Sequence, residues 1–387
     1  MNILSLFDGM SCGQQAIERV GIKINNYFAS EIDKYAITVT MANYPNTKQL
    51  GSVTQVDGYS LPKIDLLIGG SPCQSFSFAG KRKGMSTKDE QEILTLEHYL
   101  ELKSQEYEFE GQSYLFWEYM RLLNEVKPKY FLLENVMMGE KWEKILSKAI
   151  GVNPIMINSS LVSAQNRQRL YWTNIGMKPS GLFGDLESTI QQPKDLGILL
   201  KDILEPEVDK KYFLSQKMID GFLGHNKNHE GKTGFVWQPT EGNKKGAYLR
   251  ANAALCATDN SIIVHNTMPR SSKTGKGGTG PLKRQDGKTY CLDTGNTNAL
   301  QIVATQLGKS EKWGNCTNEK GKSYALLKLQ PNGIILNSRI RRLTPIECER
   351  LQTVKENYTN HVSDSQRYKM LGNGWTVDVI AHIFKYI

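Results

Sequence analysis

The chain has 387 residues, enough for one large domain or two ordinary ones, and carries a formal net charge of +9. This charge suits a polyanionic partner, because Lys and Arg neutralise phosphates; a basic protein without such a partner is the alternative. Six scattered cysteines without a C-x-x-C pair argue against a zinc site or a disulfide framework and fit reduced intracellular thiols. Neither a leader-like segment nor an apolar run of about 18 residues occurs, so we expect a cytoplasmic protein without a membrane span.

The N-terminal pattern is strand, glycine-containing loop, helix, strand and acid. We expect strands at 3–7 and 24–29, a helix at 14–20, and Glu31 just past the second strand. Glycines Gly9 and Gly13 let the loop backbone approach a ligand, and an acid about twenty residues on can bond ribose hydroxyls. Because G-x-G-x-x-G is absent, a nucleoside cofactor without a pyrophosphate fits better than a dinucleotide. A purely structural turn is the alternative.

A third apolar run leads to a cysteine. Residues 64–68 are typical of a strand buried on both faces, and we expect Gly69 and Gly70 to end it. Ser71-Pro72 then predicts a loop with Cys73 at its crest. Ligands of doubly wound sheets bind just past the carboxyl ends of the strands, so Cys73 is a candidate for chemistry. A buried, inert thiol is the alternative.

Charged residues follow two further segments. A buried strand at 129–136 ends in Glu134-Asn135-Val136. In Gln165-Asn166-Arg167-Gln168-Arg169, the two arginines project to the same side if the segment enters a strand. A carboxylate and one or two guanidinium groups are therefore expected near the same sheet edge.

The second half of the chain is irregular and basic. Between His225 and Tyr290 there are 11 Lys plus Arg against 4 Asp plus Glu, which favours contact with nucleic acid over a flexible surface insert. Thr344, Pro345 and Glu347 then predict a helix start with a cap, an N1 proline and a first-turn acid. Residues 371–378 open a last helix that runs to Tyr386.

The motifs resemble those of the C5-cytosine-specific DNA methyltransferases of bacteria and phages, in the family's order. Gly70-Ser71-Pro72-Cys73-Gln74 resembles the nucleophile loop, and Phe7-Asp8-Gly9 with Gly13 resembles the S-adenosylmethionine loop. Glu134-Asn135-Val136, the Gln-x-Arg-x-Arg pattern from Gln165 to Arg169, and the segment from Gly372 to Val377 match later motifs. The resemblance covers 1–177 and 338–387 and matches the region between them only by position.

The resemblance implies an α/β fold, with a Rossmann-like methyltransferase sheet and a smaller irregular, β-rich target recognition domain. Its boundaries would be 1–177 for the catalytic and cofactor-binding domain, 178–337 for target recognition, and 338–387 for a C-terminal segment that completes the catalytic domain. The last helix would fold back beside the first strand.

The implied reaction transfers a methyl group from S-adenosyl-L-methionine to C5 of a cytosine flipped out of a specific double-stranded DNA sequence. The Cys73 thiolate would attack C6, Glu134 would bond N3 and the exocyclic amine, and Arg167 would hold the carbonyl. Arg169 is the second arginine candidate.

The resemblance also implies the cofactor contacts. They are Phe7, Asp8, Gly9, Gly13, Glu31, Ile32, Ser52, Pro72, Leu115, Asn373 and Trp375, with no metal. Ser52 stands where the family has an Asp that contacts the adenine amino group, so either the cofactor affinity is lower or Asp57 or Asp65 substitutes. Gly374-Trp375 departs from the family's Gly-Asn-[Ser/Ala]-Val, with Trp375 packing on the cofactor or in the core.

Two rival functions are weighed against this one. A tRNA cytosine methyltransferase would use the same scaffold, but the Cys-Phe-Thr signature of that branch is absent. A catalytically silent DNA-binding regulator has Ser52 and Gly374 in its favour, whereas the presence of Cys73, Glu134 and Arg167 together opposes it. We expect a monomer in a restriction-modification system; no readout code relates the insert to a target sequence.

Overall fold

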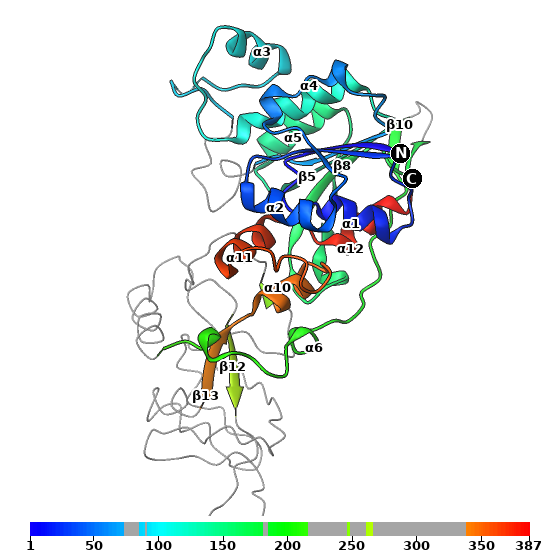
Figure 1. Ribbon diagram of the computed structural model, residues 1–387. Helices are drawn as coiled ribbons and strands as arrows, with labels where there is room; N and C mark the ends of the chain where they lie inside the picture. The colour runs from blue at the N-terminus through cyan, green and yellow to red at the C-terminus, as the bar shows by residue number, and fades with distance from the viewer. Residues whose placement is uncertain (73–84, 90, 181–184, 216–245, 248–260, 266–337) are drawn as a thin grey trace, which may run out of the picture.

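The fold was analysed in a computed structural model of the chain. The structure describes residues 1–72, 85–89, 91–180, 185–215, 246–247, 261–265 and 338–387 (Figure 1). Cys73 and Gln74, and most of the predicted recognition region, lie outside these described residues.

A seven-stranded mixed sheet forms the centre of the molecule, in the order β3-β2-β1-β4-β5-β8-β6. The strands from β3 to β5 in this order run parallel, and β8 is antiparallel to both of its neighbours. The chain leaves β1 toward β2 on one side and reaches β4 on the other, so the order reverses between β1 and β4. Such a reversal opens a crevice outside the carboxyl ends of the strands. The strands are β1 (Asn2–Leu6), β2 (Asn26–Ser30), β3 (Lys48–Gln49), β4 (Leu66–Gly70), β5 (Tyr130–Val136), β6 (Ile155–Asn158) and β8 (Gln168–Thr173).

Helices cover both faces of this sheet (Figure 1). Successive strand residues point to opposite faces, so Ile3 joins one apolar core and Leu4 the other. One face carries α1 (Cys12–Arg19), α2 (Lys34–Asn43) and α12 (Val377–Phe384). The other carries α3 (Leu96–Ser104), α4 (Phe116–Val126) and α5 (Glu140–Ile150). Among the described residues, no helix combines the length and apolar character that crossing a membrane requires.

The C-terminal helix returns to the start of the chain, as predicted. Helix α12 packs against α1, and the two chain ends lie close together (Figure 1). The Arg19 guanidinium on α1 contacts the Asp378 carboxylate and the Thr353 carbonyl. The last segment is therefore an integral part of the sheet-and-helix body, although it is far from α1 in sequence.

One prediction about β4 was wrong. The strand does not stop before Gly69 and Gly70; they are its last two residues, with Gly69 opposite Leu6 and Leu133, and Gly70 opposite Glu134. Neither glycine has a positive φ, so neither is needed for a turn. They are needed for space: a Cβ on Gly69 would lie 3.0 Å from the Tyr119 ring. Close approach of neighbouring groups, not chain reversal, explains this glycine pair.

The described parts of the second half add short strand pairs. A hairpin is formed by β9 (Met177–Ser180) and β10 (Asp185–Ser188), and β11 (Gly246–Ala247) pairs with β7 (Gln165–Asn166). β12 (Ser261–His265) pairs antiparallel with β13 (Ser338–Arg342). The remaining helices are α6 (Leu200–Ile203), α10 (Pro345–Leu351) and α11 (Asp364–Asn373), with 3-10 turns at Val53–Gln55, Gly58–Ser60, Ser113–Leu115, Ser159–Leu161 and Lys210–Tyr212.

The helix start at Thr344 is confirmed. The Thr344 hydroxyl accepts from the Glu347 amide, and the Glu347 carboxylate accepts from the Thr344 amide, which is a capping box with Pro345 in the first turn. The same carboxylate accepts from the Arg341 guanidinium of β13 at 2.6 and 2.7 Å and from the Glu205 amide at 2.8 Å. Glu347 thus connects two segments that are far apart in the sequence, the one at Glu205 and the one at Arg341, which lie on either side of the mostly undescribed residues 216–337.

Candidate active site

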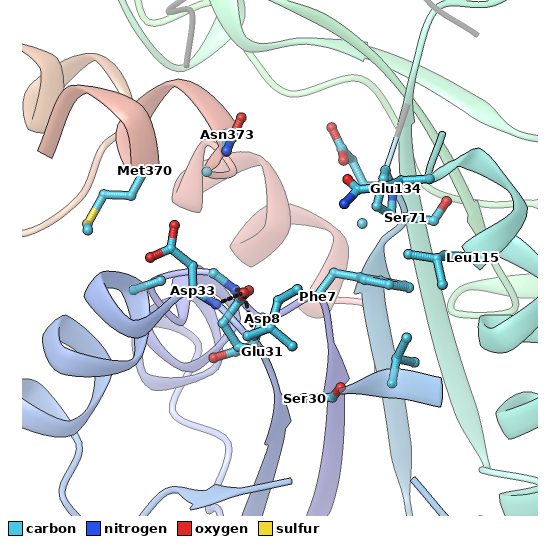
Figure 2. Close-up of a pocket in the computed structure, with 18 of the residues that line it drawn as sticks. Phe7, Asp8, Ser30, Glu31, Asp33, Ser71, Leu115, Glu134, Met370 and Asn373 are labelled. Carbon is cyan, nitrogen blue, oxygen red and sulfur yellow. Dashed lines mark hydrogen bonds between the residues drawn. The ribbon is translucent and has the colours of Figure 1, made fainter. Parts of the chain in front are cut away.

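A cavity of about 650 Å³ lies at the carboxyl ends of β1, β4 and β5. This volume is within the range of small-molecule sites. Figure 2 shows that Glu31 and Asp8 lie at one side of it and Glu134 and Ser71 at the other. Gly13 does not line it, and Cys73 is not described. The predicted site residues that do line it are Phe7, Asp8, Gly9, Glu31, Ile32, Ser52, Pro72, Leu115, Glu134, Arg167, Arg169, Asn373 and Trp375.

Gly13 contributes by close packing instead. A Cβ at this position would collide with Ile68 of β4 and would lie 3.0 Å from the Tyr27 hydroxyl. Glycine therefore lets the first turn of α1 pack directly against β4 and β2, although Gly13 itself does not line the cavity.

The Glu31 carboxylate accepts hydrogen bonds from three backbone N–H groups, one in the loop after β1 and two in the residues that follow Glu31. Gly9 donates to Oε2 at 2.8 Å, while Ile32 and Asp33 donate to Oε1 at 2.7 and 2.8 Å. Gly9 has a φ of 57°, a conformation that glycine adopts without strain. A carboxylate has about four lone-pair positions, so Glu31 can still accept a hydroxyl from a ligand.

Asp8 lies beside Glu31. Its carboxylate accepts from the Tyr27 hydroxyl at 2.8 Å and from the Ser11 hydroxyl. Removal from water raises the pKa of Asp8 to about 6, although the hydroxyl donors act to lower it. This side of the cavity thus has one carboxylate that accepts from three backbone amides and one whose raised pKa lets it gain a proton readily.

The wall at Ser52 carries no carboxylate. The Ser52 hydroxyl bonds the Thr54 hydroxyl at 2.8 Å and accepts from the Thr54 amide at 3.4 Å. Of the two alternatives for the missing acid, substitution by Asp57 or Asp65 is not supported by the structure. Neither lines the cavity, because Asp57 accepts from the Tyr59 amide and Asp65 from the Asn2 amide.

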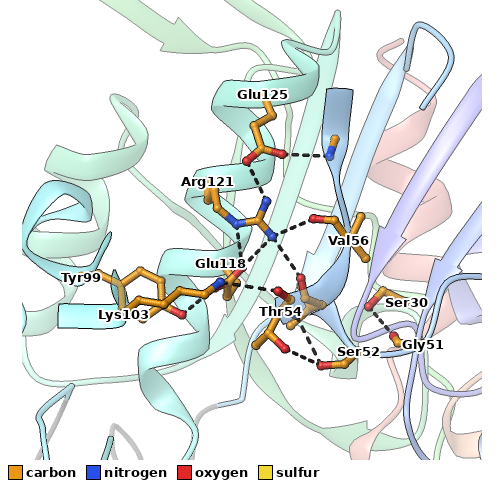
Figure 3. A network of polar contacts seen from close by, with 12 residues as sticks. Ser30, Gly51, Ser52, Thr54, Val56, Tyr99, Lys103, Glu118, Arg121 and Glu125 are labelled. Atoms are coloured by element: carbon orange, nitrogen blue, oxygen red, sulfur yellow. Dashed lines mark hydrogen bonds and ion pairs between the residues drawn. The ribbon is translucent and has the colours of Figure 1, made fainter. Parts of the chain in front are cut away.

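A buried polar network contacts the turn that follows Ser52 (Figure 3). Arg121 of α4 donates to the carbonyls of Val53 and Val56 at 3.1 and 3.0 Å. Glu118, fully buried on the same helix, accepts from Arg121 at 2.8 Å and from the Tyr99 hydroxyl at 2.6 Å, and contacts the Lys103 ammonium. Burial acts to raise the pKa of Glu118, but these donors hold it below its usual value. The turn after Ser52 is therefore tied to α3 and α4.

Glu134 lies two residues before the end of β5, at the other side of the cavity, and is 9% exposed. Its Oε1 lies 3.0 Å from Nε of Arg169, and its Oε2 accepts from the Trp375 indole at 3.2 Å. The next residue, Asn135, donates to the Ser71 hydroxyl at 3.0 Å. The predicted catalytic carboxylate is thus adjacent to the start of the predicted nucleophile loop.

The two arginines do not occupy equivalent positions. Arg167 falls between β7 and β8, so the alternation that would place both side chains on one face is broken. Its guanidinium donates to the carbonyls of Gly372 and Gly374 at 3.3 and 3.0 Å, whereas Arg169 contacts Glu134. Both line the cavity, and Arg169 is the one that pairs with the Glu134 carboxylate.

Several lining residues were not identified from the sequence. Asp33 of the α2 cap and Lys369 of α11 form an ion pair of 2.6 Å at the cavity, beside Met370. Asp33 is a recognisable helix cap, but nothing local indicates that Lys369 reaches it. The pair depends on the packing of α11 against α2, which only the assembled fold provides.

Comparison with known proteins identifies the family. The family model for C-5 cytosine-specific DNA methylase matches residues 1–387. The orphan methyltransferase M.SPRI of Bacillus phage SPR is 26% identical, over 100% of this chain and 97% of the phage protein. The type II methyltransferase M.HgiCI of Herpetosiphon aurantiacus is 28% identical, over 96% and 93% of the two chains.

Solved structures support the fold. The Entamoeba histolytica methyltransferase EhMeth superposes with a TM-score of 0.57 at 16% identity, over 100% of this chain and 97% of the other. The S. pombe Dnmt2 methyltransferase gives a TM-score of 0.56 at 14% identity with the same coverage. The α/β fold with its methyltransferase-type sheet is therefore confirmed. Because the family model spans the whole chain, this protein belongs to the C-5 cytosine-specific DNA methylase family and is a DNA (cytosine-5-)-methyltransferase that uses S-adenosylmethionine as its methyl donor.

Proposed function

We propose that the Glu31 side of the cavity holds S-adenosylmethionine and that the Glu134 side receives the target cytosine. The cavity size and its lining fit the cofactor: Glu31 can accept from ribose hydroxyls, while Phe7, Ile32 and Leu115 offer apolar surface to a purine. Ile32 lines the cavity and is 72% exposed, so its apolar side chain is accessible to a ligand there. When bound, the cofactor supplies the methyl group.

Residues of this chain would activate the cytosine ring for methylation at C5. A base in the stack is unreachable, so the target must rotate out of the duplex. The thiolate of Cys73, which directly follows Pro72 of the cavity wall, attacks C6 and forms a covalent bond. Glu134 in its protonated form donates to N3 and accepts from the exocyclic amine, and the proton on N3 balances the electron pair that the thiolate pushes into the ring. Once C5 carries the methyl group, a base acting through water removes the C5 proton, the Cys73 sulfur leaves C6 as the thiolate, and the proton on N3 returns to Glu134.

We propose that Arg169, rather than Arg167, binds the carbonyl oxygen of the cytosine. Arg169 is already paired with Glu134, so one guanidinium can hold the carboxylate and the base together. Arg167 would support the Gly372–Gly374 segment through its carbonyls. The single observation that carries the proposal is that Glu31 and Glu134 line one cavity at opposite sides, with the start of the Cys73 loop beside Glu134.

The first test is cytosine-methylation sequencing of genomic DNA from a host that lacks such methylation, expressing this chain or its Cys73→Ala variant. Methylation within one short motif, seen only with the intact chain, supports the role of Cys73 and reveals the target. Cys348→Ala is a matched control, because it removes a buried thiol of α10 that does not line the cavity. Methylation by the Cys73→Ala variant at the level of the intact chain would refute the proposed nucleophile.

We further propose that residues 178–337 read the duplex and that 1–177 and 338–387 form the catalytic body. Glu347 supports this division, since it bonds both Glu205 and Arg341, where the chain enters and leaves the second-half region. Glu347→Gln should raise KM for DNA while the affinity for S-adenosylhomocysteine stays unchanged. Equal use of tRNA and duplex DNA as methyl acceptors would contradict the proposed duplex reading.

The relatives bear names of both type II and orphan methyltransferases. We propose that this enzyme likewise modifies a short duplex sequence in the cytoplasm, as a monomer, and serves a restriction-modification system where a matching endonuclease is present. Sedimentation of the purified chain with and without target duplex tests the monomer. Cleavage of unmethylated host DNA at the target motif by an extract of the source tests the endonuclease.

A further inference from the structure

Trp375 stands out among the cavity residues because it contacts the catalytic carboxylate from a distant part of the chain. Its indole Nε1 donates to Oε2 of Glu134 at 3.2 Å, across a separation of 241 residues. It lines the cavity and precedes the first turn of α12. The family pattern at this place has a smaller side chain, so the contact is a feature of this chain's own residue.

The surroundings are shaped to admit the indole. A Cβ on Gly70 would lie 3.0 Å from the indole Nε1 and 3.1 Å from Oε2 of Glu134. A Cβ on Gly13 would lie 3.7 Å from the far edge of the same ring. The indole therefore lies over the end of β4 and reaches toward the first turn of α1, and glycine at position 70 leaves room for the hydrogen bond.

The backbone on both sides of Trp375 is anchored. The Gly374 carbonyl accepts from Arg167 at 3.0 Å and from Gln352 at 3.1 Å. The buried Thr376 hydroxyl bonds Ser159 at 2.8 Å and Gln352 at 2.9 Å. Because these bonds hold the chain on either side, the indole N–H is preorganised toward Glu134 rather than free to turn away.

Glu134 is consequently held at both oxygens by different donors. Arg169 contacts Oε1 and Trp375 contacts Oε2. A carboxylate held at one oxygen can still rotate about its last bond, whereas two donors fix its plane. The indole N–H is a neutral donor. It therefore restrains Glu134 without adding a second positive charge, which would favour the ionised carboxylate and oppose its exchange of a proton with cytosine.

We propose that Trp375 is a positioning residue that orients Glu134 for the target cytosine, beyond any packing against the cofactor. This inference rests on the proposed catalytic role of Glu134. It predicts that loss of the N–H alone impairs turnover, while the aromatic ring suffices for cofactor binding.

The test is Trp375→Phe, which keeps a ring and removes the donor. A hydrogen bond to a charged group contributes about 1.5–3 kcal/mol, so we expect kcat to fall roughly 10–100-fold. KM for S-adenosylmethionine and the calorimetric Kd for S-adenosylhomocysteine should stay unchanged. Unchanged kcat, or a fall in kcat matched by weaker cofactor binding, would overturn the proposal.

Trp172→Phe is the matched control. Trp172 is fully buried and its indole donates to the Ser147 hydroxyl at 2.9 Å, yet it does not line the cavity. It should lower the melting temperature without changing kcat. A comparable loss of kcat in both variants would mean that removing any buried indole donor disturbs the enzyme, and the specific role of Trp375 would be refuted.

A second variant keeps the inference testable if Trp375→Phe folds poorly. Gly70→Ala keeps the Trp375 side chain but crowds both partners of the hydrogen bond, because its methyl group would lie 3.0 Å from the indole nitrogen and 3.1 Å from Oε2 of Glu134. It should lower kcat with cofactor affinity unchanged, and full activity would contradict the proposal.

Glu134→Ala separates the two levels of inference. If that variant retains turnover, the proposed function fails. If it loses turnover and Trp375→Phe does not, only the role of Trp375 fails. In the Glu134→Ala background, Trp375→Phe should have no further effect on the residual rate, because its partner is gone.

Discussion

The two ends of the cavity hold their carboxylates in opposite ways. Glu31 accepts from three backbone amides, and two of them belong to the residues that immediately follow it. Glu134 is held by two side chains, Arg169 from the antiparallel strand β8 and Trp375 from the segment before α12. The Glu31 end, the proposed cofactor end, is therefore built mainly by local turns, and the Glu134 end, the proposed catalytic end, by the assembly of distant segments.

This difference has a functional consequence. Backbone amides change little when side chains are replaced, so the Glu31 end tolerates substitutions around it. The Glu134 end depends on β8 and on the C-terminal segment both being in place. We expect cofactor binding and catalysis to respond separately to mutation, and the following predictions test that separation.

The largest effect is expected at the catalytic end. Glu134→Gln keeps the size of the side chain but removes the charge that pairs with Arg169. Turnover should fall roughly 10²–10⁴-fold, the contribution typical of a general acid–base group. Steady-state methyl transfer to unmethylated duplex DNA measures it, with calorimetric binding of S-adenosylhomocysteine expected to be unchanged. A parallel loss of binding would show that the two ends are not separable.

Glu118→Gln tests whether the cofactor end also depends on distant contacts. Removing one partner of a buried ion pair costs about 3–5 kcal/mol, and Glu118 is completely buried between Lys103 and Arg121. We expect this loss in chemical denaturation, together with weaker S-adenosylhomocysteine binding, because Arg121 holds the Val53 carbonyl. Glu140→Gln, which breaks an exposed pair with Lys144, should change neither quantity. If Glu118→Gln binds S-adenosylhomocysteine as tightly as the unmodified enzyme, cofactor binding does not depend on the contacts of α3 and α4 with the turn after Ser52.

Glu31→Ala removes the acceptor for three amides and the proposed ribose ligand. Hydrogen bonds to a charged group contribute about 1.5–3 kcal/mol, so Kd for S-adenosylhomocysteine should rise roughly 10–100-fold. At saturating cofactor, kcat should be close to that of the unmodified enzyme. A collapse of kcat under these conditions would contradict the division of labour between Glu31 and Glu134.

Asp8 gives the cofactor end a pH dependence. Its folded pKa, raised to about 6, exceeds the ordinary value of 3.8, so the folded state binds the proton more tightly than the unfolded state. The contribution of Asp8 to stability is therefore most favourable at low pH and declines as the pH rises from about 4 to about 6. Asp8→Asn should gain stability relative to the unmodified enzyme over this window, as melting temperatures at a series of pH values would show. A constant difference across the window would oppose this assignment.

The smallest effect is expected for the ion pair between Asp33 and Lys369 at the cavity. Both side chains are partly exposed, and such pairs contribute about 0–1 kcal/mol. Lys369→Met should change Kd for S-adenosylhomocysteine by less than about fivefold. A much larger change would mean that this distant contact, and not only local backbone, builds the cofactor end.

Much of the site could be predicted because its motifs are short and local. Glu31 follows its strand and meets amides of its own turn, and the Thr344–Glu347 capping box is contained within four residues. The arginines were harder, since the alternation of a strand treats Arg167 and Arg169 alike. The break between β7 and β8 at Arg167 separates them, and it arises from pairing with strands elsewhere in the chain.

The sequence by itself determined the family, the reaction class, and many of the residues that line the cavity, because local motifs carry the groups that the chemistry needs. The tertiary structure decided which of these groups touch. It placed Gly69 and Gly70 within β4, turned Asp57 and Asp65 away from the cavity, paired Arg169 with Glu134, and brought Trp375 across the end of β4. The physical reason is that backbone turns are specified within a few residues, whereas contacts between side chains depend on strand order and on helix packing over the whole chain.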